Sequence, residues 1–222
     1  VRGVTVACGR KGGTASPRRG RALFKRVGWA WMRVLTLGFV AFLLPGPLSG
    51  QEMALTVPTQ WSLFDRILGF DRALDERTDG GLVLGVVYQD RNRVSSTARG
   101  EIVTAHRETP GRILNGDRVR IVSIQASSMN ELGRRLAEEG VDLLYLTPLR
   151  SQDASEIAEV ARELRIPTLT GVPEYMGEGV CLGLGQRGGR PEILVNLDAC
   201  RDGGMDLNSE LLKLATVVSP GS

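Results

Sequence analysis

The run Leu82-Val-Leu-Gly-Val-Val-Tyr88 decides the fold class. It is apolar throughout, rich in β-branched residues and short, so it predicts a strand that is buried on both faces of a sheet. Similar runs follow at residues 118–124, 141–146 and 166–170. Strands of this kind are typical of the interior of a parallel sheet.

The segments between these strands have the apolar spacing of amphipathic helices. Residues 58–77, 95–106 and 151–164 each place apolar side chains on one face. A further helix is expected after Ser128, which has capping-box spacing to Glu131, and Gly140 is expected to end it. Strand–helix alternation of this kind predicts a mostly parallel sheet with helices on both faces.

The pattern changes towards the end of the chain. Residues 180–185 and 192–196 flank a Gly-Gly turn and predict a β-hairpin. A last helix is expected over residues 209–217, capped by Asn208, with a buried face made by Leu211, Leu212 and Ala215. The predicted fold class is therefore α/β. It is a single-domain sandwich with a mostly parallel central sheet, helices on both faces, and a C-terminal β-hairpin plus helix.

The first 50 residues are predicted to direct export. Residues 34–44 form an uncharged apolar run that is too short to span a bilayer comfortably. Arg33 precedes it, and helix-breaking and small residues follow up to Gly50, which is the layout of a secretory signal peptide. Cleavage is expected after Gly50. Gln51 stands where a lipoprotein needs its lipidated cysteine, so a lipid anchor is not expected.

Two points about this segment stay open. A start at Met32 would give a compact signal peptide and would make residues 1–31 an over-extended gene start, whereas the alternative is a long basic leader. The apolar run could also remain uncleaved as an N-terminal membrane anchor. In each case residues 1–50 are an extension and signal peptide, and residues 51–222 form one domain outside the cytoplasm.

Charge is divided unevenly between these two parts. Residues 1–50 contain nine Lys or Arg and no acidic residue, whereas residues 51–222 contain 19 basic and 25 acidic residues, a net charge of −6. Phosphate binding needs clustered Lys and Arg. We therefore do not expect a nucleic-acid partner.

No catalytic, cofactor or metal site is predicted. His106 is the only histidine, and we expect it to be exposed at a helix end, without the partners of a metal site or a catalytic triad. The glycines at 183–185 and 188–189 lie in the predicted hairpin rather than between a strand and a helix, so they indicate turns and not a phosphate loop. Asp153, Glu156 and Glu159 predict a solvated helix face.

The cysteines Cys181 and Cys200 form an even pair in a compartment that is oxidising. If the glycines form the hairpin turn, Cys181 faces Asn196, and Cys200 lies four residues further on. That separation is too large for a disulfide unless the chain turns back at once into a helix. A disulfide and two buried free thiols both remain open.

Five segments of the C-terminal third occur in a recognisable order: residues 166–170, 175–182 and 190–197, Ala199, and residues 208–215. In this order they resemble the YfiR family of periplasmic proteins. That family has a Phe-Ala-x-x-Gly-Gly-Met-Ile segment, a basic strand ending in Asn-Leu, and a Leu-rich closing helix. The resemblance spans about residues 60–218. Val180 and Cys181 depart from the family's Gly and Met, which marks a divergent member.

The resemblance implies a non-enzymatic regulator that acts in the periplasm without a cofactor. Its partner would be the periplasmic part of an inner-membrane signalling protein, expected to be a GGDEF diguanylate cyclase that it represses; a homodimer is left open. A solute-binding component of a transporter is the alternative, although a cleft between two lobes needs a second α/β domain. An enzyme, such as a small hydrolase that uses acidic residues, is a third class, with no paired motif to support it.

Overall fold

A seven-stranded sheet lies at the centre of the described part of the chain. The computed structural model describes residues 52–78, 81–108, 118–126, 128–149 and 151–219; the expected signal peptide lies outside these ranges. The strand order is β2-β1-β3-β4-β5-β6-β7. The strands are β1 (Gly81–Tyr88), β2 (Arg118–Gln125), β3 (Leu143–Leu146), β4 (Thr168–Thr170), β5 (Leu182–Arg187), β6 (Arg190–Val195) and β7 (Thr216–Val217).

Every neighbouring pair of these strands is parallel except β5 with β6, which form an antiparallel hairpin. Gly188 and Gly189 make the hairpin turn with φ of 57° and 79°, a backbone region that favours glycine. The mostly parallel sheet and the C-terminal hairpin predicted from the sequence are therefore confirmed.

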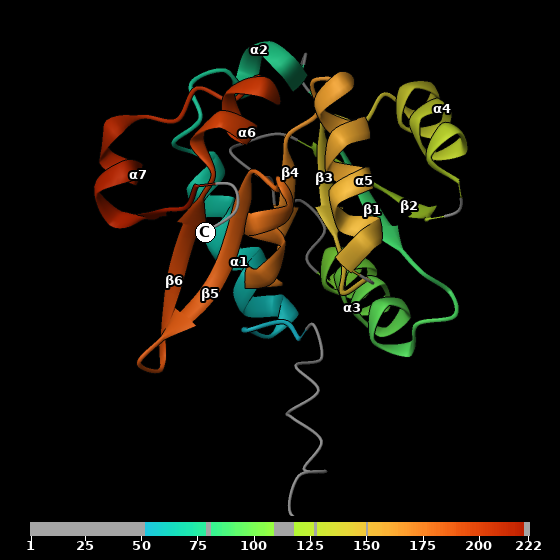
Figure 1. The fold of residues 1–222 in the computed structure, drawn as a ribbon, viewed down its shortest axis with the longest axis horizontal. Coiled ribbons are helices and arrows are strands. Elements are labelled where there is room, and N and C mark those ends of the chain that lie inside the picture. Colours follow the sequence, from blue (N-terminus) through green and yellow to red (C-terminus); the bar gives the residue numbers. More distant parts are fainter. Residues whose placement is uncertain (1–51, 79–80, 109–117, 127, 150, 220–222) are drawn as a thin grey trace, which may run out of the picture. The chain divides into compact units, whose positions relative to one another are not determined.

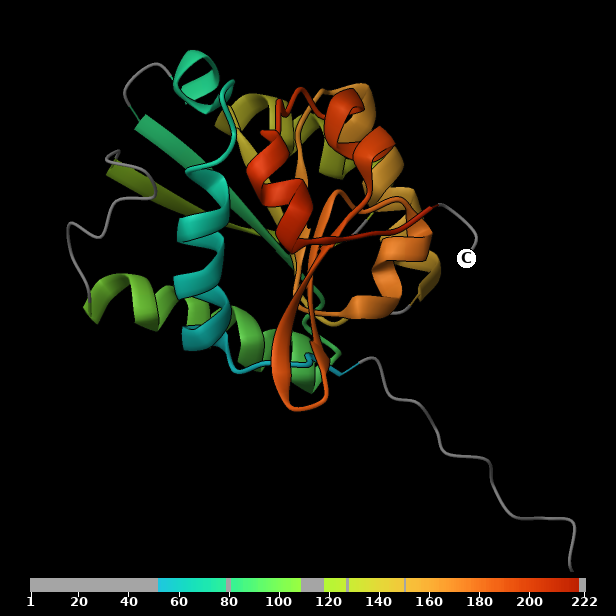
Figure 2. The same ribbon diagram turned by 90° about the vertical axis from the view of Figure 1, so that its left-hand side faces the viewer.

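Helices cover both faces of the sheet, as predicted (Figures 1 and 2). Residues of α1 (Val57–Leu68), α2 (Leu74–Thr78), α3 (Arg93–Glu108), α6 (Leu197–Asp202) and α7 (Ser209–Leu214) contribute to the hydrophobic cluster on one face. Residues of α4 (Met129–Glu139), α5 (Ser151–Glu163) and the 3-10 helix η1 (Pro173–Glu178) contribute to the cluster on the other.

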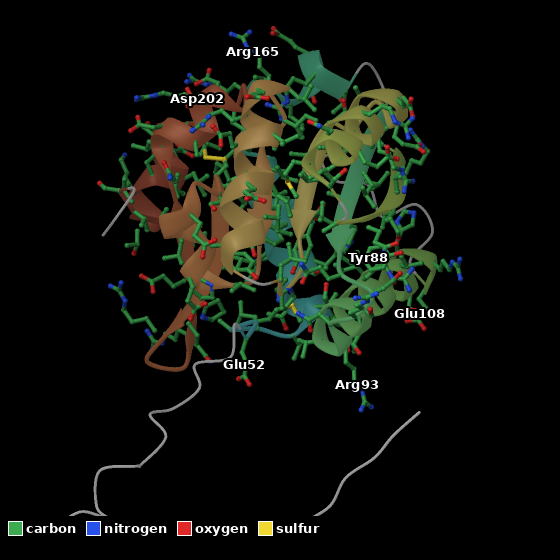
Figure 3. All side chains as sticks on the ribbon, turned by 45° about the vertical axis from the view of Figure 1, so that its right-hand side comes forward. Glu52, Tyr88, Arg93, Glu108, Arg165 and Asp202 are labelled. Carbon is green, nitrogen blue, oxygen red and sulfur yellow. A yellow bond between two sulfur atoms is a disulfide. The ribbon has the colours of Figure 1, made fainter. Side chains whose placement is uncertain are left out.

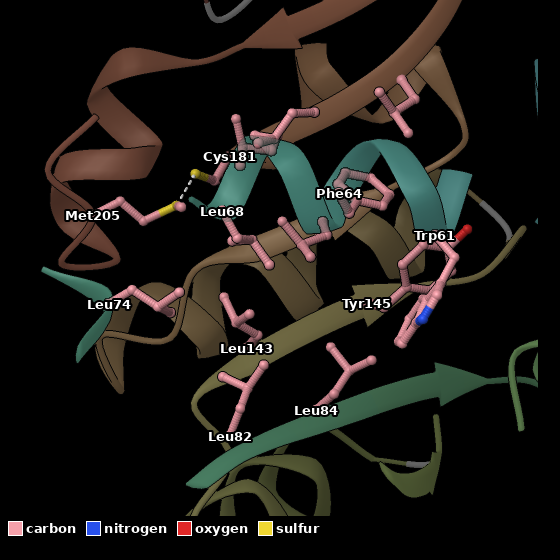
Figure 4. Packing of buried hydrophobic residues seen from close by; sticks show 14 of the residues in the cluster. Trp61, Phe64, Leu68, Leu74, Leu82, Leu84, Leu143, Tyr145, Cys181 and Met205 are labelled. Atoms are coloured by element: carbon pink, nitrogen blue, oxygen red, sulfur yellow. Dashed lines mark hydrogen bonds between the residues drawn. The ribbon is translucent and has the colours of Figure 1, made fainter. Parts of the chain in front are cut away.

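Alternation along the strands divides the core into these two layers. Leu82 and Leu84 of β1 are fully buried towards α1, where Phe64 packs edge-to-face on the Tyr145 ring with centroids 6.1 Å apart (Figure 4). Val87 belongs to the opposite cluster. Burying each such side chain stabilises the fold by roughly 1.5–3 kcal/mol.

The prediction of one continuous helix over residues 58–77 is wrong, because the structure has two helices in this range. Helix α1 ends at Leu68, and α2 begins at Leu74. Between them the buried carboxylate of Asp71 accepts hydrogen bonds from the backbone N–H groups of Ala73 and Asp206, and pairs with Arg77 at 2.8 Å. This contact with the distant C-terminal region stabilises the interruption, which local periodicity cannot reveal.

The closing helix is shorter than predicted. Helix α7 ends at Leu214 rather than at residue 217, and Ala215 is extended, with φ −98° and ψ 153°. The next two residues form β7, because the edge of β6 offers backbone partners that a further helical turn would leave unused. Leu211 is fully buried as predicted, whereas Leu212 and Ala215 are only partly buried.

The capping predicted for α4 is confirmed. The Ser128 hydroxyl accepts a hydrogen bond from the Glu131 N–H, and Gly140 ends the helix in the left-handed conformation, with φ 60°. Two short helices, α6 and η1, were not in the predicted set. The Asn196 side chain caps α6 by accepting from the Ala199 N–H, and Pro173 stands in the first turn of η1. These local signals were present in the sequence.

Candidate functional site

The chain changes direction across the sheet between β1 and β3. From β1 it runs outward through α3 to β2, and it then returns through α4 to β3 on the other side of β1 (Figure 1). Open α/β sheets bind ligands at such a switch point, outside the carboxyl ends of the strands. The loops after Tyr88 and Leu146 are therefore the first place to search for a site.

A buried hydrogen-bond chain joins these two loops. The Thr147 hydroxyl donates to the Val87 carbonyl at 2.8 Å, so the Ser95 hydroxyl, 2.6 Å away, donates to Thr147. Ser95 in turn accepts from the Gln89 N–H at 2.8 Å. The Asn92 amide donates to the Pro148 carbonyl at 3.0 Å. The switch point is thus occupied by the chain's own polar groups.

A second set of buried polar groups lies beside it, under the segment that precedes α1. We call residues 52–56 the strap. The Ala54 N–H of the strap donates to the Gly171 carbonyl at 3.1 Å, at the end of β4. The buried Gln60 amide donates to the Leu55 carbonyl at 2.7 Å, and its oxygen accepts from the Tyr145 hydroxyl at 2.6 Å. The strap therefore covers this edge of the sheet.

These polar groups are structural rather than chemically activated. Burial raises the pKa of Tyr145 well above the ordinary tyrosine value, so its hydroxyl remains a neutral donor at physiological pH. A Cβ at the neighbouring Gly171 would overlap the Gln60 amide, so a larger residue there would displace Gln60 from its hydrogen bonds. On η1, the buried Tyr175 hydroxyl donates to the Leu149 carbonyl at 2.7 Å.

An open groove remains on the outer side of the strap. It has a volume of about 970 Å³ and lies between the strap and α3. Its lining includes Ala54, Leu55, Val94 and Ala105. Glu52, Glu101 and Glu108 also line it, and Glu52 and Glu108 project from this edge in Figure 3. The groove is thus a surface of apolar and acidic character.

A smaller hollow of about 540 Å³ lies at the carboxyl ends of β1 and β2. It is lined by residues 89–93 with Gln125 and Ala126. Nearby, the guanidinium carbon of Arg99 lies 4.5 Å from the centre of the Tyr88 ring. This hollow is more polar than the groove.

Two carboxyl groups with raised pKa lie on different elements. Burial raises the pKa of Asp142, whose carboxylate accepts from the Val83 N–H at 2.8 Å, and burial also raises that of Glu178 on η1. Asp142 precedes β3, on a different element from Glu178. Within the described residues, no group of three or more His, Cys, Asp or Glu could hold a metal ion.

His106 is half-buried in the last turn of α3 rather than fully exposed. Among the predicted carboxylate stripe, Glu156 and Glu159 are exposed on α5 as expected, whereas the side chain of Asp153 lies outside the described residues. The glycines at 183–185 and 188–189 lie in the hairpin.

The structure brings Cys181 and Cys200 together in disulfide geometry, with Cα atoms 4.7 Å apart. Cys181 precedes β5 and faces Asn196, whose N–H donates to its carbonyl at 2.9 Å. Helix α6 starts at the next residue, so the chain turns back at once and returns Cys200 to the hairpin. The Met205 sulfur lies 3.3 Å from that of Cys181 (Figure 4).

The profile of the YfiR/HmsC-like family matches residues 76–216. The chain belongs to this family. The matched range includes every strand from β1 to β6, whereas α1 and the strap precede it. Membership supports a periplasmic regulatory role in general terms. No curated protein sequence matches the chain.

A solved structure shares the fold of this family member at low sequence identity. A conserved domain protein from Vibrio cholerae O1 biovar El Tor is 13% identical, with a TM-score of 0.51, over 73% of this chain and 60% of that one. A substrate-binding protein with adhesive properties from Clostridium difficile is 17% identical, over 67% and 58%, with a TM-score of 0.45. The chain thus spans about 60% of the length of both structures, and the likeness to the first concerns the fold alone.

The groove was missed by sequence reasoning, which named no binding surface. The nearest sequence signal was Gly100 in the middle of a predicted helix, where glycine is unfavourable.

Within the described residues, no helix is long and apolar enough to cross a membrane.

Proposed function

We propose that this chain is an exported regulator that binds the periplasmic part of an inner-membrane signalling protein and catalyses nothing. The partner we propose is a GGDEF diguanylate cyclase, which the bound regulator holds in its less active state. Family membership supports the regulatory role, and the apolar run at 34–44 after Arg33 supports export.

The observation that carries this proposal is the closed switch point. In a solute-binding lobe, polar groups at this edge would point towards a ligand, whereas here Ser95 and Thr147 hydrogen-bond to each other under the loops. Tyr145 and Gln60 are likewise paired beneath the strap. With these groups paired, the outer groove of about 970 Å³ is larger than the polar hollow beside β1 and β2, and its open apolar lining favours a macromolecular partner over a small solute.

Regulation of this kind requires different affinities for two states of the partner. A regulator that bound the active and inactive cyclase equally well would leave its output unchanged, however tightly it bound. The acidic domain, with a net charge of −6, favours a basic partner surface, and charge of this kind mainly raises the association rate.

Deletion and capture together test the proposal. We expect deletion of the gene to raise cyclic di-GMP, and a tagged copy expressed from its own leader to recover an inner-membrane cyclase from detergent-solubilised membranes. The control is the same tag on a co-expressed, unrelated periplasmic protein. Recovery of a permease together with a small solute, seen by native mass spectrometry of the purified protein, would support the transport alternative and overturn the proposal.

A further inference from the structure

The lining of the groove between the strap and α3 includes a glycine in the middle of the helix. Gly100 lies in the interior of α3 and lines the groove. Glycine is unfavourable there relative to alanine, because it loses more backbone freedom on folding. A Cβ at Gly100 would meet no atom of the described residues within 4 Å, in contrast to Gly171, where it would overlap Gln60. The fold itself therefore does not require glycine at this position.

Small side chains continue along the same surface of α3. Thr97, Thr104 and Ala105 line the groove together with Gly100, and Ala54 faces them from the strap. Val94 at one end is 52% exposed, although valine is usually buried. Small residues let another backbone approach closely, and an exposed apolar residue provides area to bury against it.

The charged residues of the described groove lining are all acidic. Glu52, Glu101 and Glu108 are exposed and line it, and no Lys or Arg does among the residues that the structure describes. None of the three carboxylates takes part in an ion pair within the described residues. An occupant with Lys or Arg beside an apolar stripe would complement this arrangement.

We propose that the groove binds an amphipathic helix of the signalling partner, with small apolar residues on its contact face and Lys or Arg on its flanks. Helix α3 has 16 residues, which gives a length of about 24 Å at 1.5 Å per residue. A partner helix of about four turns matches this length and would place its apolar stripe over Gly100, the mode of helix-in-groove recognition. This inference rests on the proposed function and specifies the surface that performs it.

Site-specific photocrosslinking in intact cells tests the location. A photoreactive residue at Thr97 or Thr104 should crosslink to an inner-membrane protein through a Lys- or Arg-flanked segment. The same residue at the exposed Glu163 of α5 should not. Crosslinks from α3 to a second copy of this chain, or to its own residues 1–50, would overturn the inference. So would capture of a membrane partner that crosslinks only from α5. Failure to capture any membrane partner would instead contradict the proposed function itself.

A designed peptide tests the chemistry. The probe is a 16-residue helical peptide with an Ala/Leu stripe flanked by Lys, compared with a peptide that has Glu in place of Lys. By fluorescence anisotropy we expect the Lys peptide to bind at least tenfold more tightly than the Glu peptide, and its affinity to fall as salt is raised.

Glycine variants localise that binding. Gly100→Trp should weaken binding of the Lys peptide at least tenfold, whereas Gly100→Ala should retain it. Gly177→Trp is a matched control, since Gly177 lies on η1 and a Cβ there also meets nothing within 4 Å. Thermal melting shows whether each variant is folded. Equal binding by folded Gly100→Trp and wild type, or failure of the Lys peptide to bind wild type, would overturn the inference.

Discussion

The Tyr145 hydroxyl donates a buried hydrogen bond to the side-chain oxygen of Gln60, 2.6 Å away and 85 residues earlier in the chain. Tyr145 lies in β3 and Gln60 in α1, so the bond joins the sheet to the helix that follows the strap. Its removal would leave the Gln60 oxygen buried without this donor.

Tyr145→Phe should therefore destabilise the protein by about 1–3 kcal/mol, the cost of leaving a buried polar group unsatisfied. Urea unfolding followed by circular dichroism measures the change. Tyr88→Phe is the control, because Tyr88 is only half-buried, and its stability should stay close to that of wild type. Equal effects of the two substitutions would show that the Gln60 contact contributes little.

Alkaline pH should weaken the same contact. Burial raises the folded-state pKa of Tyr145 above its ordinary value of 10. The stabilisation from its neutral form is thus fully present below pH 10 and is lost as pH rises further, because only the unfolded chain releases the proton easily. Above about pH 10 the free energy of unfolding should fall more steeply with pH for wild type than for Tyr145→Phe. Parallel curves would contradict this assignment.

Cys181 and Cys200 are predicted to form a disulfide. Protein purified from the periplasm should show Cys181 linked to Cys200 by mass spectrometry without reduction, because their Cα atoms lie 4.7 Å apart. The link closes a loop with a sequence separation of 19 and should stabilise the fold by about 3 kcal/mol in the chain-entropy model. The double variant Cys181→Ser/Cys200→Ser should lose this amount. Alkylation of both thiols in unreduced protein would show that they are unpaired.

The closing helix offers a matched pair of leucines. Leu211→Ala should cost about 2–5 kcal/mol, because Leu211 is fully buried in the α1-side core. Leu214→Ala should change stability by less than about 0.5 kcal/mol, since Leu214 is 71% exposed. Chemical denaturation of both variants makes the comparison, and a large effect at Leu214 with none at Leu211 would reverse the assigned faces of α7.

Loss of the Asp71 charge should destabilise the protein more than loss of the Asp206 charge. Asp71→Asn breaks a buried pair with Arg77 and should cost about 3–5 kcal/mol. Asp206→Asn removes only the exposed pair with Arg72, which is worth about 0–1 kcal/mol. Unfolding at low and high salt separates them, because salt screens the exposed pair far more. If Asp71→Asn leaves the free energy of unfolding unchanged, the α1–α2 break does not depend on this charge.

The strands and helices that follow local rules were predictable from the sequence. The continuous run at 82–88 identified β1, and the Ser128–Glu131 spacing identified the start of α4. The break after Leu68 had a local signal in Gly69, the C-cap of α1, but the contact of Asp71 with Asp206, 135 residues away, was not predictable. The groove was not predictable either, since periodicity does not show which face of α3 stays uncovered. Gly100 is visible in the sequence, but the sequence alone does not show that it lines a groove.

The two residues of β7 have a consequence for solubility. Thr216 and Val217 lie against β6, the Thr216 hydroxyl donates to Glu192 at 2.6 Å, and the Val218 N–H donates to the Val195 carbonyl at 2.8 Å. This short strand caps the edge of a projecting hairpin, which would otherwise present unpaired backbone groups to neighbouring molecules. Chains shortened to Leu214 would keep the helix but expose that edge, so they should self-associate through strand pairing rather than simply unfold.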